Sequence, residues 1–162
     1  MKKIDITISV QEYDKTEELN PEDRSLLERA KNAIGSAYAP YSAYRVGAAV
    51  LLENGEIITG NNQENVAYPS GLCAERVALF YAASQFPDVP VKAIAITAKA
   101  NGFVIETPVT PCGSCRQVMA ETENRFKNKM KLVMMGEKGK VQVIDGVENI
   151  LPLMFHAEKL KK

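Results

Sequence analysis

The chain has 162 residues, of which 46% are hydrophobic and 25% charged, values typical of a globular protein. Its 20 lysines and arginines balance its 20 aspartates and glutamates, which argues against a protein built to neutralise the phosphates of a nucleic acid. No apolar run reaches the ~18 residues of a membrane span, and Asp5 and Ser9 interrupt the segment where a signal peptide would be apolar. We therefore expect a single cytoplasmic domain over residues 1–162, with no membrane or nucleic-acid partner, an extension over 1–18 and a tail over 156–162.

The first ten residues alternate between polar and apolar side chains, a period-two pattern that predicts a strand with one buried face. Its apolar members are Ile4, Ile6, Ile8 and Val10. This strand could extend the edge of a sheet or meet another subunit. A charged stretch over residues 12–18 follows, and Asn20-Pro21 then opens a helical pattern that reaches to about residue 34.

A hairpin follows the first helix. Its strands are expected over residues 46–52 and 56–59, and Asn54-Gly55 joins them because both residue types tolerate a positive φ. The polar residues 60–72 predict a loop. The later elements are expected as a helix over 74–84, a strand over 92–98, a helix over 113–124, strands over 131–135 and 140–144, and a short helical piece before Leu151.

Helices that alternate with strands indicate an α/β domain with helices packed on a central sheet. Strands joined by a hairpin are antiparallel, whereas strands joined through a helix can be parallel. The sheet is therefore expected to be mixed.

Three cysteines, Cys73, Cys112 and Cys115, lie at the starts of predicted helices. The partial positive charge of a helix N-terminus favours thiolate over thiol. Three thiolates bind zinc well and leave a fourth tetrahedral position open for water. The alternatives are buried cysteines without a function, or a redox-active Cys-x-x-Cys. A structural zinc site would need a fourth ligand, and the single histidine, His156, is expected to lie far from the cysteines.

Glu75 lies only two residues after Cys73, and residues at this spacing do not share a face of a regular helix. Cys73 must therefore precede the helix proper. The expected role of Glu75 is to hold and move a proton beside a metal-bound water, although a glutamate here would also suit the helix dipole. Arg76 is expected to donate hydrogen bonds to the sulfurs and so draw negative charge off them. Arg116 could do the same, and either arginine could instead lie in solvent.

Cys73-Ala74-Glu75-Arg76, together with Pro111–Gln117, resembles the motifs of the small homotetrameric cytidine deaminases, which belong to the zinc deaminases. Residues 41–49, 60–65 and 151–155 also resemble segments of that family, so the resemblance extends roughly over residues 26–155. It implies a three-layer α/β/α fold around a central mixed sheet of about five strands. It further implies one Zn²⁺ per chain, held by the three cysteines, and a free nucleoside and water as substrates of a homotetramer.

The same resemblance implies a set of substrate contacts. Two residues of the 60–65 loop would bind the sugar hydroxyls, one backbone N–H would bind ring O2, one aromatic ring would lie beside the base, and two more would reach a neighbouring subunit's site. In that order they are Asn62 and Glu64, Ala74, Tyr44, and Tyr68 and Phe155. A carbonyl near Thr110-Pro111 would accept from the amino group. Tyr44 stands where the family usually has Phe, and Val66 where it usually has Ala.

The implied reaction is the zinc-dependent hydrolytic deamination of cytidine and deoxycytidine to uridine and deoxyuridine, with release of ammonia, a step of pyrimidine salvage. Glu75 would take a proton from water, protonate ring N3 and then protonate the leaving amine. The sequence leaves three alternatives open. A deaminase of a modified cytosine nucleoside, such as blasticidin S, would share the motifs. A polynucleotide editor is disfavoured by the zero net charge. A structural zinc protein or an inactive ligand-binding relative is disfavoured by Glu75.

Overall fold

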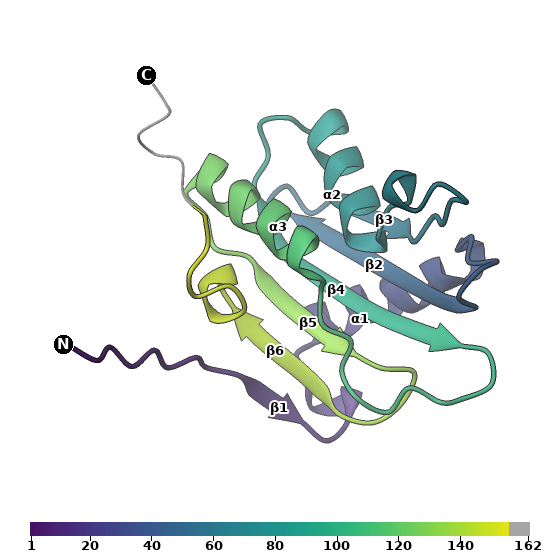
Figure 1. The fold of residues 1–162 in the computed structure, drawn as a ribbon, viewed down its shortest axis with the longest axis horizontal. Helices are drawn as coiled ribbons and strands as arrows, with labels where there is room; N and C mark the ends of the chain where they lie inside the picture. The colour runs from purple at the N-terminus through teal and green to yellow at the C-terminus, as the bar shows by residue number, and fades with distance from the viewer. Residues whose placement is uncertain (156–162) are drawn as a thin grey trace.

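The computed structural model describes residues 1–155, and the predicted tail with His156 lies outside the described residues (Figure 1). Within them, one mixed sheet of six strands has the order β1-β6-β5-β4-β2-β3. The strands are β1 (Gln11–Tyr13), β2 (Tyr44–Leu52), β3 (Ile57–Asn61), β4 (Val91–Ala100), β5 (Lys131–Met135) and β6 (Val141–Asp145). The α-helices are α1 (Pro21–Ala33), α2 (Ala74–Gln85) and α3 (Gly113–Phe126).

The sheet is the middle one of three layers, with α1 on one face and α2 and α3 on the other (Figure 1). Because successive side chains of a strand point to opposite faces, Ile94 and Ile96 of β4 pack with α2 and α3, whereas Ala93 and Ala95 pack with α1. Strands β4 and β5 are parallel and are connected through α3, while the other neighbouring pairs are antiparallel. The predicted three-layer α/β/α class and the mixed sheet are confirmed.

The predicted N-terminal strand is wrong, and the sheet has six strands rather than about five. Residues 1–10 form no strand, and their alternating apolar side chains are exposed. The sheet instead gains Gln11–Tyr13, three residues at the start of the charged stretch, which pair with β6. A strand needs the hydrogen bonds of a neighbour, and the registered partners of β6 on this side stop at Gln11. Alternation of apolar side chains alone does not supply them.

Two glycines in the sheet bring helices close to it. A Cβ on Gly47 of β2 would collide with the carbonyl oxygen of Ala30 in α1. A Cβ on Gly60 of β3 would lie 2.6 Å from both the carbonyl oxygen of Ala74 and the amide nitrogen of Ala78 in α2. The backbone of β3 therefore sets the position of α2, whose first turn follows Cys73.

Among residues 1–155, the structure contains no helix with the length and apolar character that a membrane span requires.

Candidate active site

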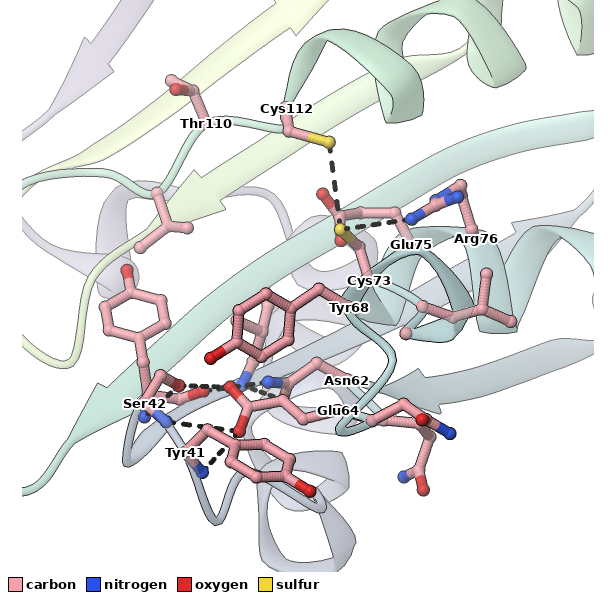
Figure 2. A pocket seen from close by; sticks show the side chains of 17 residues that line it. Tyr41, Ser42, Asn62, Glu64, Tyr68, Cys73, Glu75, Arg76, Thr110 and Cys112 are labelled. Carbon is pink, nitrogen blue, oxygen red and sulfur yellow. Dashed lines mark hydrogen bonds between the residues drawn. The ribbon is translucent and has the colours of Figure 1, made fainter.

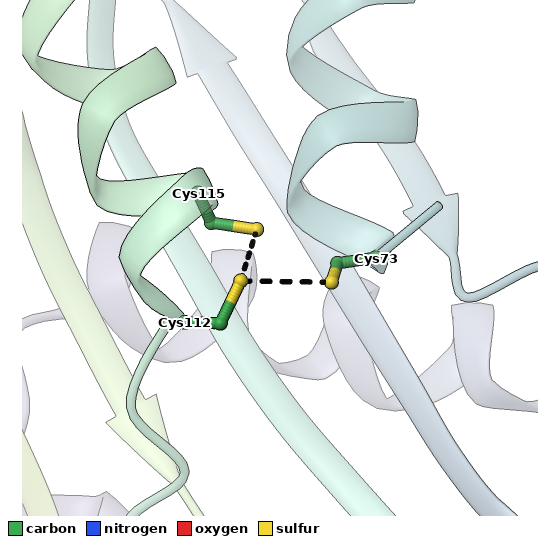
Figure 3. A group of neighbouring side chains, drawn as sticks. All are labelled: Cys73, Cys112 and Cys115. Atoms are coloured by element: carbon green, nitrogen blue, oxygen red, sulfur yellow. Dashed lines mark hydrogen bonds between the residues drawn. The ribbon is translucent and has the colours of Figure 1, made fainter. Parts of the chain in front are cut away.

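The three cysteines meet where the N-termini of α2 and α3 lie side by side (Figure 3). Cys73 and Cys112 are the N-cap residues of the two helices and have extended backbone, while Cys115 lies in the first turn of α3. The Sγ atom of Cys112 lies 3.8 Å from that of Cys73 and 3.4 Å from that of Cys115. All three sulfurs lie within 4.8 Å of one another. Cys73 thus precedes its helix, as its spacing from Glu75 required.

The groups around the sulfur of Cys73 favour its thiolate form. The neighbouring Cys115 thiol and the Arg76 guanidinium lower the pKa of Cys73 to about 5. The pKa of Cys115 is raised, because its proton is held beside Cys73 and because the residue is buried. The sulfur of Cys73 is therefore a thiolate at neutral pH, and a coordinating metal deprotonates its other thiol ligands.

The sequence left open whether Arg76 or Arg116 donates to the sulfurs, and the structure shows Arg76 in this position. The Nη2 atom of Arg76 lies 3.8 Å from the sulfur of Cys73. The Nε of Arg76 is buried and has no acceptor among the described residues. This positive group can therefore offset the negative charge that three thiolates would bring. Arg116 instead donates to two backbone carbonyls, those of Pro111 and Ile150. Three soft sulfur donors beside a cation form a set that zinc accepts.

Glu75 lies in the first turn of α2 and is only 4% exposed. Burial, and to a smaller extent the negative charge of Cys73, raise the pKa of Glu75 above its ordinary value. Its carboxyl can therefore hold a proton at a higher pH than a glutamate in solvent. That property suits a group that must both accept and donate protons.

A pocket of about 680 Å³ opens beside this centre (Figure 2). Its size falls in the range of small-molecule sites. Four separate segments line it, over residues 41–46, 62–65, 68–76 and 109–112. The predicted site residues among its lining are Tyr44, Asn62, Glu64, Tyr68, Cys73, Glu75, Arg76, Thr110 and Cys112. Ala74 and Cys115 are buried behind the lining, and Phe155 is exposed outside it.

Asn62 and Glu64, the predicted sugar ligands, also hold the opposite wall of the pocket. The side-chain oxygen of Asn62 accepts from the N–H of Val46 at 2.8 Å, and its amide donates to the carbonyl of Tyr44 at 2.9 Å. Glu64 Oε2 accepts from the N–H groups of Tyr41 and Ser42, at 2.9 and 3.2 Å. Each carboxylate oxygen can accept more than one hydrogen bond. These contacts therefore hold Glu64 in place and still leave it able to accept hydrogen bonds from a ligand.

Ser42, which connects Glu64 to Tyr44, was not among the predicted site residues. The hydroxyl of Ser42 donates to Glu64 Oε1 and accepts from the N–H of Tyr44 at 3.0 Å. This bond is the main reason that the pKa of Glu64 lies below its ordinary value, so the carboxylate stays ionised. Ala43, which lies between Ser42 and Tyr44 in the chain, has a φ of 54°, which is uncommon for alanine. No local pattern in the sequence announces this contact, because the partner of Ser42 lies 22 residues away.

Comparison with known proteins gives the chain its family. A model of the cytidine and deoxycytidylate deaminase zinc-binding region matches residues 20–130. The cytidine deaminase of Halalkalibacterium halodurans is 42% identical over 135 residues, which are 83% of this chain and 95% of that one. That of Sporosarcina psychrophila is also 42% identical, over 83% of this chain and 92% of its own. The crystal structure of cytidine deaminase from Burkholderia pseudomallei superposes with a TM-score of 0.70 at 37% identity, over 85% of this chain and all of that one. The chain belongs to the cytidine deaminase family and carries its zinc-binding region.

Proposed function

We propose that this protein catalyses the zinc-dependent hydrolytic deamination of cytidine and deoxycytidine to uridine and deoxyuridine, with release of ammonia. The observation that carries the proposal is one pocket with a three-sulfur cluster, a buried carboxyl and, opposite them, a fixed amide and carboxylate. Such a pocket offers separate places for the reacting base and for the sugar. The relatives named above are cytidine deaminases, which supports the same substrates.

Cys73, Cys112 and Cys115 would hold one zinc ion, and when bound it supplies the Lewis acid that makes water a nucleophile at neutral pH. Glu75 accepts the proton that this water loses and passes it to ring N3, which makes C4 more electrophilic. The water oxygen bonds to C4, the C4–N4 bond breaks, and Glu75 delivers the second proton of the water to the leaving amine. Cytidine and water thereby become uridine and ammonia. The raised pKa of Glu75 suits both of its proton transfers.

Other groups of the chain orient the substrate. The N–H of Ala74 donates to ring O2, and a carbonyl at Thr110-Pro111 accepts from the amino group, so that C4 is held beside Glu75. The ring of Tyr44 packs beside the base. Asn62 and Glu64 bind sugar hydroxyls that cytidine and deoxycytidine share, so both nucleosides are substrates.

We propose further that the enzyme acts as a homotetramer in the cytoplasm, in pyrimidine salvage. Tyr68 and Phe155 would each reach the site of a neighbouring subunit. Their exposure, 78% and 68%, leaves both side chains available for such a contact. The three free thiols suit a reducing compartment.

The test is to incubate the purified protein with cytidine, to follow the loss of the cytosine absorbance band, and to measure zinc on the same sample. Turnover with about one zinc per chain is expected, which fits the open fourth position of a three-ligand site. Zinc without turnover of cytidine would overturn the substrate assignment, and a panel of modified cytosine nucleosides would then separate a specialised deaminase from a binding protein. Neither zinc nor turnover after reconstitution with metal would overturn the zinc site itself.

A further inference from the structure

We propose that Arg116 is a positioning residue for the metal centre, which fastens the loop bearing Cys112 to the C-terminal segment and so holds the Cys112 sulfur in place. The inference rests on the zinc site of the proposed function. It differs from the role of Arg76, because the hydrogen bonds of Arg116 among the described residues go to backbone carbonyls, whereas that of Arg76 goes to a sulfur.

One guanidinium joins two segments that are distant in the sequence. Arg116 Nε donates to the carbonyl of Pro111 at 2.8 Å, and Arg116 Nη1 donates to the carbonyl of Ile150 at 2.7 Å. Pro111 directly precedes Cys112, and Ile150 directly follows the 3-10 turn η4 (Val147–Asn149). Both bonds have a charged donor, which makes them stronger than neutral ones. Since the guanidinium is planar and rigid, it fixes the two carbonyls relative to each other.

Cys112 is the cysteine that needs such support. Cys115 is fully buried within α3, and Cys73 is half-buried beside Arg76. Cys112 is exposed, and the residues that lead to it, 101–112, contain neither helix nor strand. Irregular segments move more than the elements that they connect. A thiolate must nevertheless reach a zinc ion within a few tenths of an ångström of one distance.

The same turn of α3 holds the far end of the C-terminal segment. Gln117, the next residue, donates from Nε2 to the carbonyl of Phe155 at 3.4 Å. The Ile150 carbonyl has further support of its own, because the N–H of Ile150 donates to the carbonyl of Val147 at 2.9 Å and the N–H of Val147 donates to Glu123 of α3 at 3.1 Å. It therefore gives Arg116 a fixed anchor.

The experiment measures how fast zinc leaves the loaded protein for a coloured chelator in excess. Arg116→Ala is expected to release zinc about 10–100-fold faster than the parent, the usual effect of losing a group that supports a metal ligand. Arg116→Lys is expected to fall between the two, because a lysine has the charge but not the fork that reaches both carbonyls. The melting temperature of each metal-free variant is measured in parallel.

Arg125→Ala is the matched control, because Arg125 lies at the other end of α3, donates to the carbonyl of Pro87 and packs over the ring of Phe126. It removes an arginine–carbonyl bond from the same helix, and its zinc release is expected to stay within about twofold of the parent. Equal acceleration in both alanine variants, or release at the parent rate from folded Arg116→Ala, would overturn the proposal.

If Arg116→Ala does not fold, Arg116→Lys decides, and zinc release at the parent rate from it would overturn the proposal. Cytidine turnover by the parent protein is measured on the same stock. Its absence would count against the proposed function, whereas the zinc-release rates test Arg116 whether or not cytidine is consumed.

Discussion

At the scale of single residues, the proposed chemistry depends on a carboxyl that the fold buries. Glu75 is buried beside the thiolate of Cys73, and its pKa is raised. We predict that Glu75→Gln lowers kcat by about 10²–10⁴-fold, the usual contribution of general acid–base catalysis. Zinc content should remain that of the parent, because the sulfurs are unchanged. Turnover of cytidine and bound zinc are measured on the same preparation, and near-normal kcat would contradict the proton-transfer role.

The same variant has a stability signature that a misfolded protein would not give. A raised pKa in the folded state means that ionised Glu75 costs stability, and the cost grows as pH rises through that pKa. Metal-free Glu75→Gln should therefore resist urea better than the metal-free parent at pH 8. The advantage should shrink toward pH 4, where the glutamate is protonated in the unfolded chain as well.

The sequence predicted that the three cysteines lie at helix starts and that Arg76 donates to a sulfur, and the structure shows both, but it did not predict the partners of Arg116. Cys73 and Cys112 begin helices, and a helix start is encoded by a few neighbouring residues. Whether Arg76 or Arg116 faces a sulfur depends on packing between segments that meet only in the folded chain. The carbonyl of Ile150, which Arg116 binds, lies 34 residues from it, and no local pattern announces such a bond.

At the scale of elements, the position of α2 is set by its close approach to β3 at Gly60. We predict that Gly60→Ala destabilises the fold by about 1–3 kcal/mol, the usual cost of overpacking. It should also weaken zinc binding, because a Cβ 2.6 Å from Ala74 and Ala78 must push back the helix that follows Cys73. Urea unfolding and zinc release to a chelator measure the two effects.

Gly47→Ala provides the contrast on the opposite face of the sheet. Its Cβ would collide with α1, so a loss of stability is again expected, but the folded protein should keep its zinc. Gly35→Ala meets nothing within 4 Å and should change neither property. Equal zinc release in the Gly60 and Gly47 variants would show that α2 is not specifically displaced.

The partly buried carboxylate of Glu123 is one of the groups that link α3 to the elements after it. Glu123 Oε1 accepts from the N–H of Met130 at 2.8 Å and from the N–H of Val147 at 3.1 Å. Burial raises the pKa of Glu123, so the stability due to this group falls as pH rises through its raised pKa. We predict that Glu123→Gln, which keeps the acceptor oxygen, is at least as stable as the parent at pH 8 and has a weaker pH dependence.

Glu123→Ala should instead lose about 1–3 kcal/mol, because two buried N–H groups lose their acceptor. Urea midpoints between pH 5 and pH 8 give the order of the three proteins. A glutamine variant less stable than the parent at pH 8 would mean that the charge of Glu123 is favourable, contrary to its raised pKa.

The regular elements were predictable where the pattern within a segment agreed with its burial. Strand β5 was predicted with its observed bounds, and the two helices of the metal centre were predicted to within about two residues. The alternation of Ile4 to Val10 predicted a strand that does not form, since a strand also depends on a free neighbouring edge. Strand β1 was not predicted, because its three residues lie in a charged stretch and are too few to show an alternating pattern, although the edge of β6 is there to pair with them.

At the scale of the whole molecule, the candidate metal site borders one of the two apolar cores, since Cys115 belongs to that core and Cys73 packs against it. One buried cluster fills the space between the sheet and α1, and another fills the space between the sheet and α2 and α3. Helices α2 and α3 lie beside each other on the same face of the sheet (Figure 3). Zinc would add a link between them, from Cys73 before α2 to the two cysteines at the start of α3. The apolar cores should therefore support the fold without the metal, while the metal adds to its stability.

We predict that the protein stripped of zinc by a chelator remains folded and melts cooperatively at a lower temperature. A ligand at 100 times its Kd stabilises the native state by about 2.7 kcal/mol. For a chain of this size, that corresponds to an increase of about 5–10 °C in Tm when zinc is restored. Cys112→Ala should lose the zinc-dependent increase and keep a Tm near that of the stripped parent. A full equivalent of zinc on Cys112→Ala would contradict the ligand assignment, and loss of the cooperative transition on stripping would mean that the two cores do not suffice.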